Sequence, residues 1–483
     1  MDREAGRQMT TGEIRADPRL LPAAPTGRDG RTSRRQVLKV GLAGLAGLAG
    51  ASTTGWLGCG KRQGPGEENV AATSADVFPG DAPQGEFWDA WQKQGWLTEA
   101  RHYLKLGRNV QCKVCPNQCL LEPEDRSHCR TRVNKDGTLY SLAYGNPCAV
   151  HIDPIEKKPL FHFLPGTEAF SLAIAGCVLR CLNCQNWDIS QKKPDETKDP
   201  RGEPVRARPE SLASLALADV AHLSMFPEDV VALAEHFRSA SIAYTYSEPI
   251  AWFEYLVDTS RLARQKNIKN LWITCGSIQE EPLAELCGVI DAANVNLKSY
   301  DEEIYGRLNA GRLAPILNTL TTLKREGVWF EVTNLVVPTY TDDAEMIRRM
   351  CGWLLEHLGP DYPLHFSRFH PQHKLTHLPP TPIDILLEAR EIARRLGLHY
   401  VYIGNAPQVE DGETTFCPGC KRAVIERTAF FVRSQKLAAG KCSACGTPIA
   451  GVWASAQQEA GRTEPANRGA VLPRKADDDS AVV

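Results

Sequence analysis

Apolar runs rich in β-branched and aromatic residues alternate with amphipathic stretches between Glu168 and Asn405. Seven of the apolar runs have strand character: AFSLAIAG (169–176), SIAYTYS (241–247), NLWITCG (270–276), ANVNLKS (293–299), VWFEVTNLVV (328–337), LHFSRF (364–369) and HYVYIG (399–404). Helical periodicity occupies the intervening stretches, for example PEDVVALAEHFRSA (227–240), APILNTLTTLKREG (314–327) and PIDILLEAREIARRLG (382–397). Strands alternating with helices predict parallel βα units. Six or seven units are too few for an eight-unit barrel, so we expect an α/β fold, a partial (βα)6-type TIM barrel.

The pattern changes on both sides of this core and predicts further segments. We divide the chain into a leader (1–60), a Gly/Pro/Glu-rich linker (61–85), a cysteine-rich N-terminal segment (86–167), the partial barrel (168–405), a second cysteine-rich segment (406–455) and a polar, disordered tail (456–483).

The leader has the pattern of a twin-arginine export signal. RTSRRQVLKV (31–40) is followed by a Gly/Ala-rich apolar run, with no acidic residue between Arg31 and Cys59. A transmembrane anchor is the alternative, but the glycine content and Lys39 make a poor lipid-facing helix. We therefore expect export to the outer face of the cytoplasmic membrane, with membrane association through the leader or lipidation at Cys59 as further options. A cytoplasmic enzyme is the alternative.

The cysteine content of the chain says more about its function than its net charge does. Lys plus Arg total 56 against 58 Asp plus Glu, a net charge of -2, so the chain lacks the basic excess of a nucleic-acid binder. The 483 residues include 16 cysteines. Eleven of them form three groups: Cys112, Cys115, Cys119 and Cys129; Cys177, Cys181 and Cys184; and Cys417, Cys420, Cys442 and Cys445. Disulfide frameworks belong to small secreted domains, so tight groups in a large chain favour metal binding.

The middle group follows the first predicted strand directly, where the catalytic loops of barrels lie. Structural zinc needs four ligands, and three thiols leave it one short. A four-iron cluster held by three thiolates keeps one iron open, and an open metal position can chelate a substrate. The spacing therefore favours a 4Fe-4S cluster on Cys177, Cys181 and Cys184, with zinc completed by a distant residue as the alternative.

The last group consists of two knuckles, CPGC (417–420) and CSAC (442–445), separated by 21 residues. Four thiolates complete a tetrahedron, so we expect a structural zinc ribbon, with rubredoxin-like iron as the alternative. The first group, CKVCPNQC (112–119) with Cys129, also offers four thiols. Zinc and an auxiliary iron–sulfur cluster remain equally open there; a closed cluster could relay electrons, whereas zinc would only pin the segment.

The C-x3-C-x2-C spacing after the first strand of a partial barrel resembles the radical S-adenosylmethionine (SAM) superfamily. The surrounding stretches resemble the members related to pyruvate formate-lyase activating enzyme, and among these the radical SAM enzyme of the AmmeMemoRadiSam system. They are DPIEKKPLFHFLPG (153–166), GCVLRCLNCQN (176–186), YTYSEP (244–249), EVTNLVVP (331–338) and SRFHP (367–371). The resemblance runs from about Cys112 to Asn405.

The resemblance implies a defined chemistry. The amino and carboxylate groups of SAM chelate the open iron, and one electron from the reduced cluster breaks the sulfonium bond to the 5′ carbon. The resulting 5′-deoxyadenosyl radical takes a hydrogen atom from a substrate, which we expect to be a protein or peptide, and an electron donor is required. The alternative is a non-catalytic exported iron–sulfur or zinc-binding protein that retains the fold.

The resemblance also implies SAM contacts at the ends of the predicted strands. Glu248, in YSEP, aligns with the Gly-Gly-Glu-Pro element that receives the methionyl amino group. Tyr246 and Ser247 replace both glycines, which leaves the backbone contact of that turn open.

Lys298 resembles the lysine that meets the SAM carboxylate, with a solvated strand-end lysine as the alternative. Asn296 stands where a ribose-binding aspartate is often found. Asn186 is expected to shape the cluster loop, and Trp187 either covers the cluster or adenine or packs in the core.

Polar residues on the fifth and sixth predicted strands have two readings. Glu331 and Thr333 share one face of their strand, and His365, Arg368 and His370 lie on or just after the next. They either bind substrate or the outer part of SAM, or form a hydrogen-bonded core.

Overall fold

The computed structural model describes residues 77–203, 205–209 and 223–454, all within one compact unit, Asn69–Val483. The predicted leader, most of the predicted linker and the predicted tail lie outside the described residues. Among the helices of the described part, none is long and apolar enough to cross a membrane.

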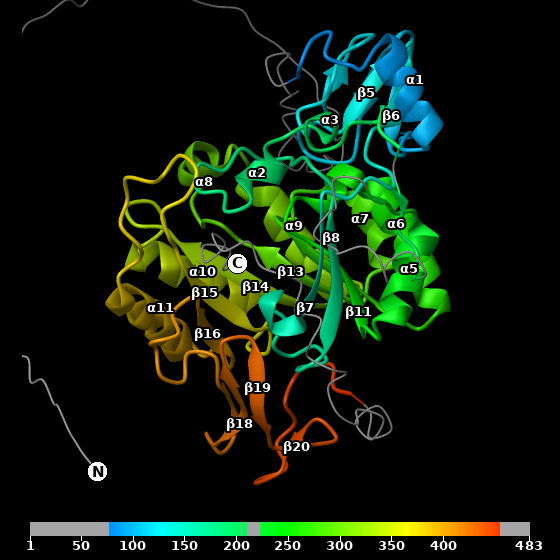
Figure 1. Cartoon of the computed structure of the whole chain (residues 1–483). Coiled ribbons are helices and arrows are strands. Elements are labelled where there is room, and N and C mark those ends of the chain that lie inside the picture. The colour runs from blue at the N-terminus through cyan, green and yellow to red at the C-terminus, as the bar shows by residue number, and fades with distance from the viewer. Residues whose placement is uncertain (1–76, 204, 210–222, 455–483) are drawn as a thin grey trace, which may run out of the picture. The chain divides into compact units, whose positions relative to one another are not determined.

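One eight-stranded sheet organises the described chain, in the order β16-β15-β14-β13-β12-β11-β8-β7 (Figure 1). Seven of its strands are parallel: β8 (Glu168–Ala173), β11 (Ser241–Tyr244), β12 (Lys269–Thr274), β13 (Ala292–Asn296), β14 (Trp329–Val336), β15 (Leu364–Arg368) and β16 (Val401–Gly404). Each corresponds to one of the seven predicted strands. Among the described residues β16 pairs only with β15, so the sheet is open, as a partial barrel requires.

The eighth strand, β7 (Ala149–Pro154), runs antiparallel to β8 at the edge of the sheet, with Ala149 opposite Ala173 and Pro154 opposite Glu168. Its sequence, AVHIDP, carries an aspartate and a proline and gives no strand signal, so the sequence analysis did not predict this strand. An antiparallel edge strand is a common addition to a parallel sheet.

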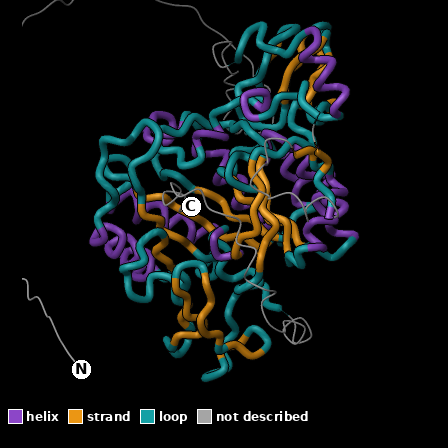
Figure 2. Tube along the Cα trace, viewed as in Figure 1, coloured by secondary structure: helices purple, strands orange, loops and turns teal. Residues whose placement is uncertain are grey.

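Helices follow the strands around the sheet (Figure 2). They are α5 (Pro227–His236), α6 (Phe253–Gln265), α7 (Glu280–Cys287), α8 (Glu302–Asn309), α9 (Leu313–Arg325), α10 (Ala344–His357) and α11 (Ile383–Leu396), with the 3-10 turn η4 (Pro249–Trp252) before α6. In α9, Ile316, Leu320 and Leu323 are buried at the spacing of one helix face. The three predicted helices are confirmed as α5, α9 and α11.

The N-terminal module contains α1 (Gly85–Gln94) and two small sheets. One sheet consists of β1 (Thr98–Glu99), β6 (Thr138–Ser141) and β5 (Arg132–Lys135); the other consists of β2 (Tyr103–Leu106), β3 (Asn109–Cys112) and β4 (Leu120–Leu121). Phe78 bridges to Arg126 and Ala82 is buried, so the last residues of the predicted linker belong to this module.

The C-terminal module contacts the barrel at the amino ends of its strands. Its strands are β17 (Thr415–Phe416), β18 (Ala423–Thr428), β19 (Phe431–Gln435), β20 (Leu437–Ala438) and β21 (Lys441–Cys442). Arg427 donates to the Phe161 carbonyl at 2.6 Å, and the Val452 amide donates to the His162 carbonyl at 2.7 Å. Five short elements complete the fold: η2 (Ile155–Lys157), α2 (Trp187–Ser190), α3 (Pro194–Thr197), β9 (Val205–Arg206) and β10 (Leu223–Ser224).

Candidate active site

The cysteine triplet lies on the loop that leaves the carboxyl end of β8. Its backbone turns at Gly176, which has φ +110°, a conformation that L side chains rarely adopt. The Gly176 carbonyl accepts the Glu248 amide at 3.4 Å, which ties this loop to the turn after β11. The Leu179 amide donates to Cys177 Sγ at 3.4 Å, and Cys184 Sγ lies 3.1 Å from Ser190 Oγ. The loop thus gathers three thiols at the edge where barrel chemistry collects.

The three thiols fit a cluster better than a single ion. Among the described residues, the four C-terminal cysteines are the one group of three or more His, Cys, Asp or Glu side chains whose ligand atoms all lie within 4.8 Å of one another. The triplet does not form such a group, and three thiols leave a single zinc ion one ligand short. Burial raises the pKa of Cys184 to about 11, and it raises the pKa of Cys177 further because the Glu248 charge adds to it. Metal binding must displace these protons.

Glu248 lies beside the triplet, at the start of η4. Its carboxylate accepts Thr274 Oγ1 at 2.7 Å, the Cys275 amide at 2.8 Å and the Ile250 amide at 3.4 Å. Burial raises its pKa, while these hydrogen bonds act in the opposite direction. A carboxylate offers about four lone-pair sites, so three donors fix its orientation and leave acceptor capacity for an ammonium group.

Tyr246 keeps the backbone conformation that glycine would favour at this turn. Its φ is +63°, an outlier for an aromatic residue. Its carbonyl accepts Asn186 Nδ2 at 3.0 Å, which ties the turn to the cluster loop. The sequence left open whether this turn keeps its backbone geometry without the two glycines. The left-handed geometry remains at Tyr246, the first of the two replaced positions.

A buried group beneath this turn was missed by the sequence analysis. Lys158 Nζ lies 2.5 Å from Asp153 Oδ2 and 4.5 Å from the centre of the Tyr246 ring, and the Tyr246 hydroxyl donates to the same carboxylate. Burial lowers the pKa of Lys158 to about 8. Burial alone would raise the pKa of Asp153, but Lys158 and Lys157 hold it well below its usual range. The signal available was the pair of motifs DPIEKK and YTYSEP, which place the three residues but not their contact.

Lys298 lies just beyond β13 and is half-buried, so it is not the solvated lysine of the alternative reading. Burial opposes its charge, but the neighbouring Cys181, Cys275 and Cys184 together raise its pKa. Its ammonium has no hydrogen-bonding partner among the described residues. Asn296, at the end of β13, donates from Nδ2 to the Thr274 carbonyl at 3.1 Å. Both residues belong to the edge that carries the triplet.

Trp187 does not pack in the core. Its side chain is 43% exposed and stacks on His373, with ring centroids 5.4 Å apart and planes at 19°.

The polar residues of β14 and β15 form a closed core. Glu331 accepts His365 Nε2 and the His162 amide, both at 2.7 Å. Thr333 Oγ1 donates to Asn294 Oδ1 at 2.9 Å. All of these residues are buried. Of the two readings for Glu331, Thr333 and His365, the structure supports the hydrogen-bonded core.

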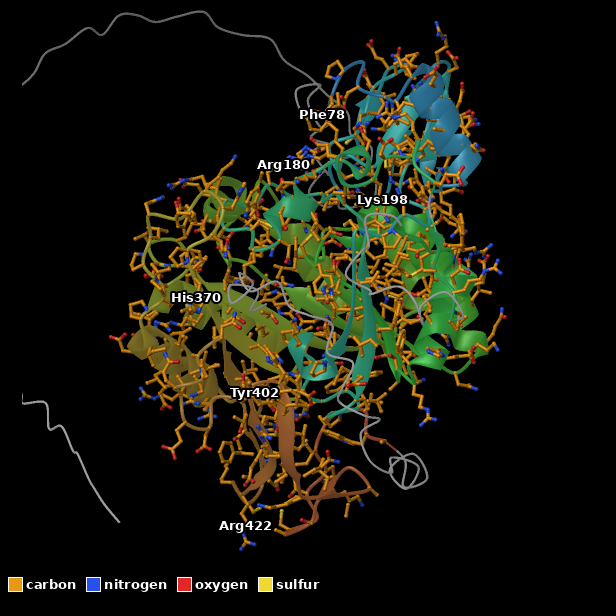
Figure 3. The ribbon with its side chains drawn as sticks, in the orientation of Figure 1. Phe78, Arg180, Lys198, His370, Tyr402 and Arg422 are labelled. Atoms are coloured by element: carbon orange, nitrogen blue, oxygen red, sulfur yellow. The ribbon has the colours of Figure 1, made fainter. Side chains whose placement is uncertain are left out.

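Arg368 is the last residue of β15, and His370 follows just beyond it. Figure 3 labels His370. Arg368 Nε donates to the Thr381 carbonyl at 2.8 Å, and His370 Nε2 is 3.5 Å from the Asn405 carbonyl. Both are only partly buried, so they remain candidates for substrate contact.

The four C-terminal thiols converge as two close pairs. Cys417 and Cys445 have their sulfurs 3.6 Å apart, and Cys420 and Cys442 have theirs 3.8 Å apart. A tetrahedron with metal–sulfur bonds of about 2.3 Å has sulfur–sulfur edges of about 3.8 Å. The arrangement therefore fits a single four-coordinate ion.

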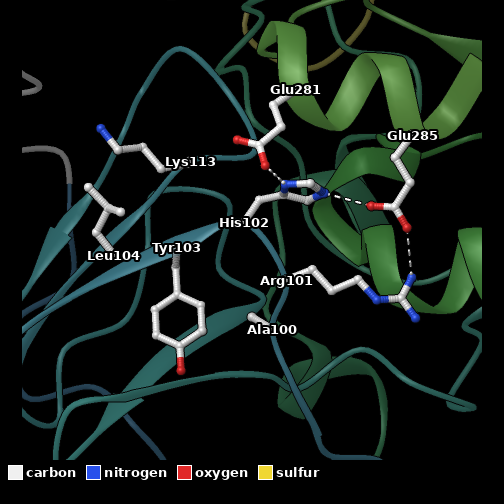
Figure 4. Close-up of a pocket in the computed structure, with 8 residues that line it drawn as sticks. All are labelled: Ala100, Arg101, His102, Tyr103, Leu104, Lys113, Glu281 and Glu285. Atoms are coloured by element: carbon white, nitrogen blue, oxygen red, sulfur yellow. Dashed lines mark hydrogen bonds and ion pairs between the residues drawn. The ribbon is translucent and has the colours of Figure 1, made fainter.

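A separate surface depression of about 490 Å³ lies between β2 and α7 (Figure 4). His102 fills its floor, with Nε2 2.7 Å from Glu285 and Nδ1 3.5 Å from Glu281. Lys113 also lines it, but the triplet, Glu248 and Lys298 do not. The depression therefore lies apart from the candidate active site.

Comparison with known proteins agrees with this geometry. The model of the Radical SAM superfamily matches residues 172–351. An uncharacterised protein of Methanocaldococcus jannaschii is 42% identical over 356 residues, which cover 73% of this chain and 99% of the relative. Among solved structures, a domain of pyruvate-formate lyase-activating enzyme from Bacteroides vulgatus is 17% identical with a TM-score of 0.30, covering 34% of this chain and 99% of that one. A radical SAM methyltransferase from Sphaerobacter thermophilus is 12% identical with a TM-score of 0.38, covering 64% and 76%.

Proposed function

Since this chain belongs to the radical SAM superfamily, we propose that it is an enzyme that binds SAM and a 4Fe-4S cluster and abstracts hydrogen from a protein or peptide. A cluster held by Cys177, Cys181 and Cys184, when bound, would supply the electron that splits SAM into methionine and the 5′-deoxyadenosyl radical. The observation that carries the proposal is the convergence of the triplet with Glu248 and Lys298 at the carboxyl edge of the sheet.

The chain's own residues would bind and orient SAM. Glu248, held by three donors, would accept the methionyl ammonium, and Lys298 would pair with the methionyl carboxylate. Asn296 would contact the ribose. Asn186 would fix the cluster loop through its bond to the Tyr246 carbonyl. Pre-oriented charges of this kind select one pose of the substrate before reaction.

We place the enzyme more finely beside pyruvate formate-lyase activating enzyme, as the radical SAM member of an AmmeMemoRadiSam system. The resemblance of the stretches DPIEKKPLFHFLPG (153–166) and YTYSEP (244–249) supports this placement. In the structure Lys158, Asp153 and Tyr246 contact one another across these two stretches.

The C-terminal knuckles would hold zinc as a structural ion. The sulfur–sulfur distances of 3.6 and 3.8 Å match a closed tetrahedron, which leaves no position for a substrate. Cys417 and Cys442 are buried against Phe161, Tyr400 and Tyr402, so the ion would fasten the module to the barrel.

The compartment is a further part of the proposal. Arg34 and Arg35, outside the described residues, support export by the twin-arginine route, which carries folded, cofactor-loaded proteins. Fractionation of cells that express the native chain, beside a variant with both arginines changed to lysine, tests it. Native protein found wholly in the cytosol with its leader intact would overturn export and leave the radical chemistry untouched.

The decisive test of the enzyme is its product. Protein reconstituted with iron and sulfide is incubated with SAM and dithionite, and 5′-deoxyadenosine is measured by chromatography. We expect its formation from the wild type and from the Cys351→Ala control, whose buried thiol lies in α10 away from all three groups. A fully loaded cluster that yields no 5′-deoxyadenosine would instead favour the non-catalytic iron–sulfur protein.

A further inference from the structure

The N-terminal module contains four buried thiols that the proposed function leaves without a role. Cys112 ends β3, Cys115 and Cys119 lie in the turn before β4, and Cys129 precedes β5. Their exposed fractions are 5%, 7%, 4% and 6%, and none is in a disulfide. The Cys112 amide donates to the Cys119 carbonyl at 3.0 Å, which closes the turn that carries Cys115. After burial, the other three thiols are the largest influences that raise the pKa of Cys115, so the four lie together.

Donors point at these sulfurs, as expected of metal-bound thiolates. The His128 amide donates to Cys119 Sγ at 3.4 Å. Ser127 Oγ accepts the Arg132 amide at 3.2 Å, so its own proton is available to Cys129 Sγ at 3.1 Å. Hydrogen bonds to cysteine sulfurs are a standard means by which proteins tune iron–sulfur clusters.

The spread of the four sulfurs argues against a single ion. In the part of the chain that the structure describes, the C-terminal knuckles alone bring three or more ligand atoms within 4.8 Å of one another. Cys112, Cys115, Cys119 and Cys129 do not form such a group. Four irons and four sulfides occupy more space than one ion, so four thiols that are not gathered around one point suit a cluster.

The N-terminal thiol group is in direct contact with the loop that carries Cys177, Cys181 and Cys184. Cys129 O lies 2.6 Å from where a Cβ at Gly176 would sit. Asn117 Nδ2 donates to the Val178 carbonyl at 2.9 Å. Arg180 donates to the Cys177 carbonyl at 3.2 Å and also to the His128 carbonyl, so one guanidinium spans both groups.

Positive charge collects at this junction. Arg130 and Arg180 are each acted on by the charges of both Cys129 and Cys177. Arg132 is buried and is paired with Glu254 at 2.9 Å, so it adds no net charge. Four thiolates around a cluster carry excess negative charge, and two shared arginines offset it at both sites.

We propose that Cys112, Cys115, Cys119 and Cys129 hold a second, closed four-iron cluster adjacent to the SAM-cleaving one. Its adjacency to a SAM-cleaving cluster rests on the proposed function; its existence does not. With all four irons ligated by thiolate it has no open position, so its chemistry is electron transfer rather than substrate binding.

The first experiment removes the cysteine triplet, so that iron can bind only at the remaining thiols. A Cys177→Ala, Cys181→Ala, Cys184→Ala variant is purified anaerobically, without reconstitution, and its iron, sulfide and zinc are counted. We expect about four iron and about four sulfide per chain, and about eight of each in the wild type. Adding Cys115→Ser and Cys119→Ser should remove the remaining iron, whereas adding Cys351→Ser should not. Since SAM cleavage is not measured, this result is independent of the proposed function.

A zinc site would give the opposite result. Two zinc ions per chain, with no iron in the triplet-free variant and about four in the wild type, would overturn the proposal. Retention of one zinc on the C-terminal thiols and a wild-type circular dichroism spectrum show that each variant is folded. The wild-type count of eight against four iron decides the matter even where a variant fails to fold.

The second experiment tests adjacency. Electron paramagnetic resonance spectra of the dithionite-reduced wild type are compared with the sum of spectra from two variants that each lack one site. We expect the wild-type spectrum to differ from that sum, because magnetic interaction between paramagnetic clusters requires proximity and the two thiol groups contact one another at Gly176 and Arg180. A spectrum equal to the sum would overturn the proposed adjacency.

Discussion

The Cys177 loop and the Cys417 knuckles are both built from thiols, yet their surroundings differ in three respects. The knuckles bring four sulfurs into pairs at 3.6 and 3.8 Å, whereas the loop offers only three thiols, which do not form a compact group of this kind. The loop is flanked by left-handed backbone at Gly176 and Tyr246. The charged Glu248 and Lys298 lie beside the loop, while the knuckles pack on Phe161, Tyr400 and Tyr402.

The difference distinguishes a loop with the features of an active site from knuckles with the features of a structural metal site. Strained backbone and buried charge persist only where the surrounding fold enforces them, and they concentrate where ligands bind. A closed set of ligands seated on aromatic side chains needs neither.

The largest effect is expected at the loop. Cys181→Ala should abolish 5′-deoxyadenosine formation, because two remaining thiolates do not hold the SAM-cleaving cluster. Iron analysis and the chromatographic assay measure it, with Cys351→Ala as the control. Substantial SAM cleavage by the Cys181→Ala protein would contradict the assignment of the triplet.

At the knuckles, Cys417→Ala should release zinc and lower the free energy of unfolding by about 4 kcal/mol or more, because a structural ion contributes directly to folding. SAM cleavage should persist at temperatures where the variant is folded. Metal analysis and chemical denaturation measure these effects. Equal loss of iron and of SAM cleavage in the Cys417→Ala and Cys181→Ala proteins would remove the distinction between the two sites.

The ease of prediction also differs between these regions. The spacing of Cys177, Cys181 and Cys184 is local, so the sequence alone identified the loop and its strand. The contact of Lys158 with Tyr246 joins residues 88 positions apart, and residue types do not report it. The left-handed φ of Tyr246 was equally hidden, because the preference of an aromatic residue opposes it.

The seven parallel strands were predicted because each is a short stretch rich in apolar, β-branched or aromatic residues that lies between helical stretches. β7 was missed because it lies at the edge and mixes His151, Asp153 and Pro154 with its apolar residues. Glu331 and Thr333 could be assigned to one face of their strand, but only the structure pairs Glu331 with His365 and decides between binding and packing.

The junction between the loop and the N-terminal module should be the next most sensitive point. Gly176→Ala would place a methyl group 2.6 Å from the Cys129 carbonyl and force an unfavourable φ. We expect a loss of about 3 kcal/mol in unfolding free energy and a lower iron content. Gly352→Ala, within α10 and with open space around it, is the matched control. Wild-type stability and iron in the Gly176→Ala protein would contradict this contact.

A smaller effect is expected for SAM binding. Lys298→Met should weaken SAM about 30-fold, since a charge-assisted hydrogen bond contributes about 2 kcal/mol. Equilibrium binding under anaerobic conditions measures it. Lys269→Met, at a 43% exposed lysine paired with Asp291 at the start of β12, should bind SAM as the wild type does. Equal affinities in both variants would exclude Lys298 from the SAM site.

The smallest effect concerns the amino end of the barrel, where His162 fastens the C-terminal module. Its Nδ1 donates to the Ala450 carbonyl at 2.6 Å, so its Nε2 accepts the Tyr402 hydroxyl at 2.5 Å, and the ring is neutral. Burial lowers the pKa of His162 to about 4 from an ordinary 6.5. The unfolded chain therefore binds the extra proton between these values, and the stability that His162 contributes above pH 6.5 is lost as the pH falls towards 4.

This linkage predicts a loss of about 1 kcal/mol between pH 6.5 and 5.5 that His162→Gln should abolish. Denaturation curves across this range measure the slope, and His357→Gln, at the exposed end of α10, serves as the control because it should keep the wild-type slope. Carboxylates that titrate nearby contribute equally to all three proteins, so the difference between slopes isolates the imidazole. Identical slopes in the wild type and His162→Gln would mean that the ring accepts its proton without loosening the module, and that the amino end of the barrel is less tightly closed than its hydrogen bonds indicate.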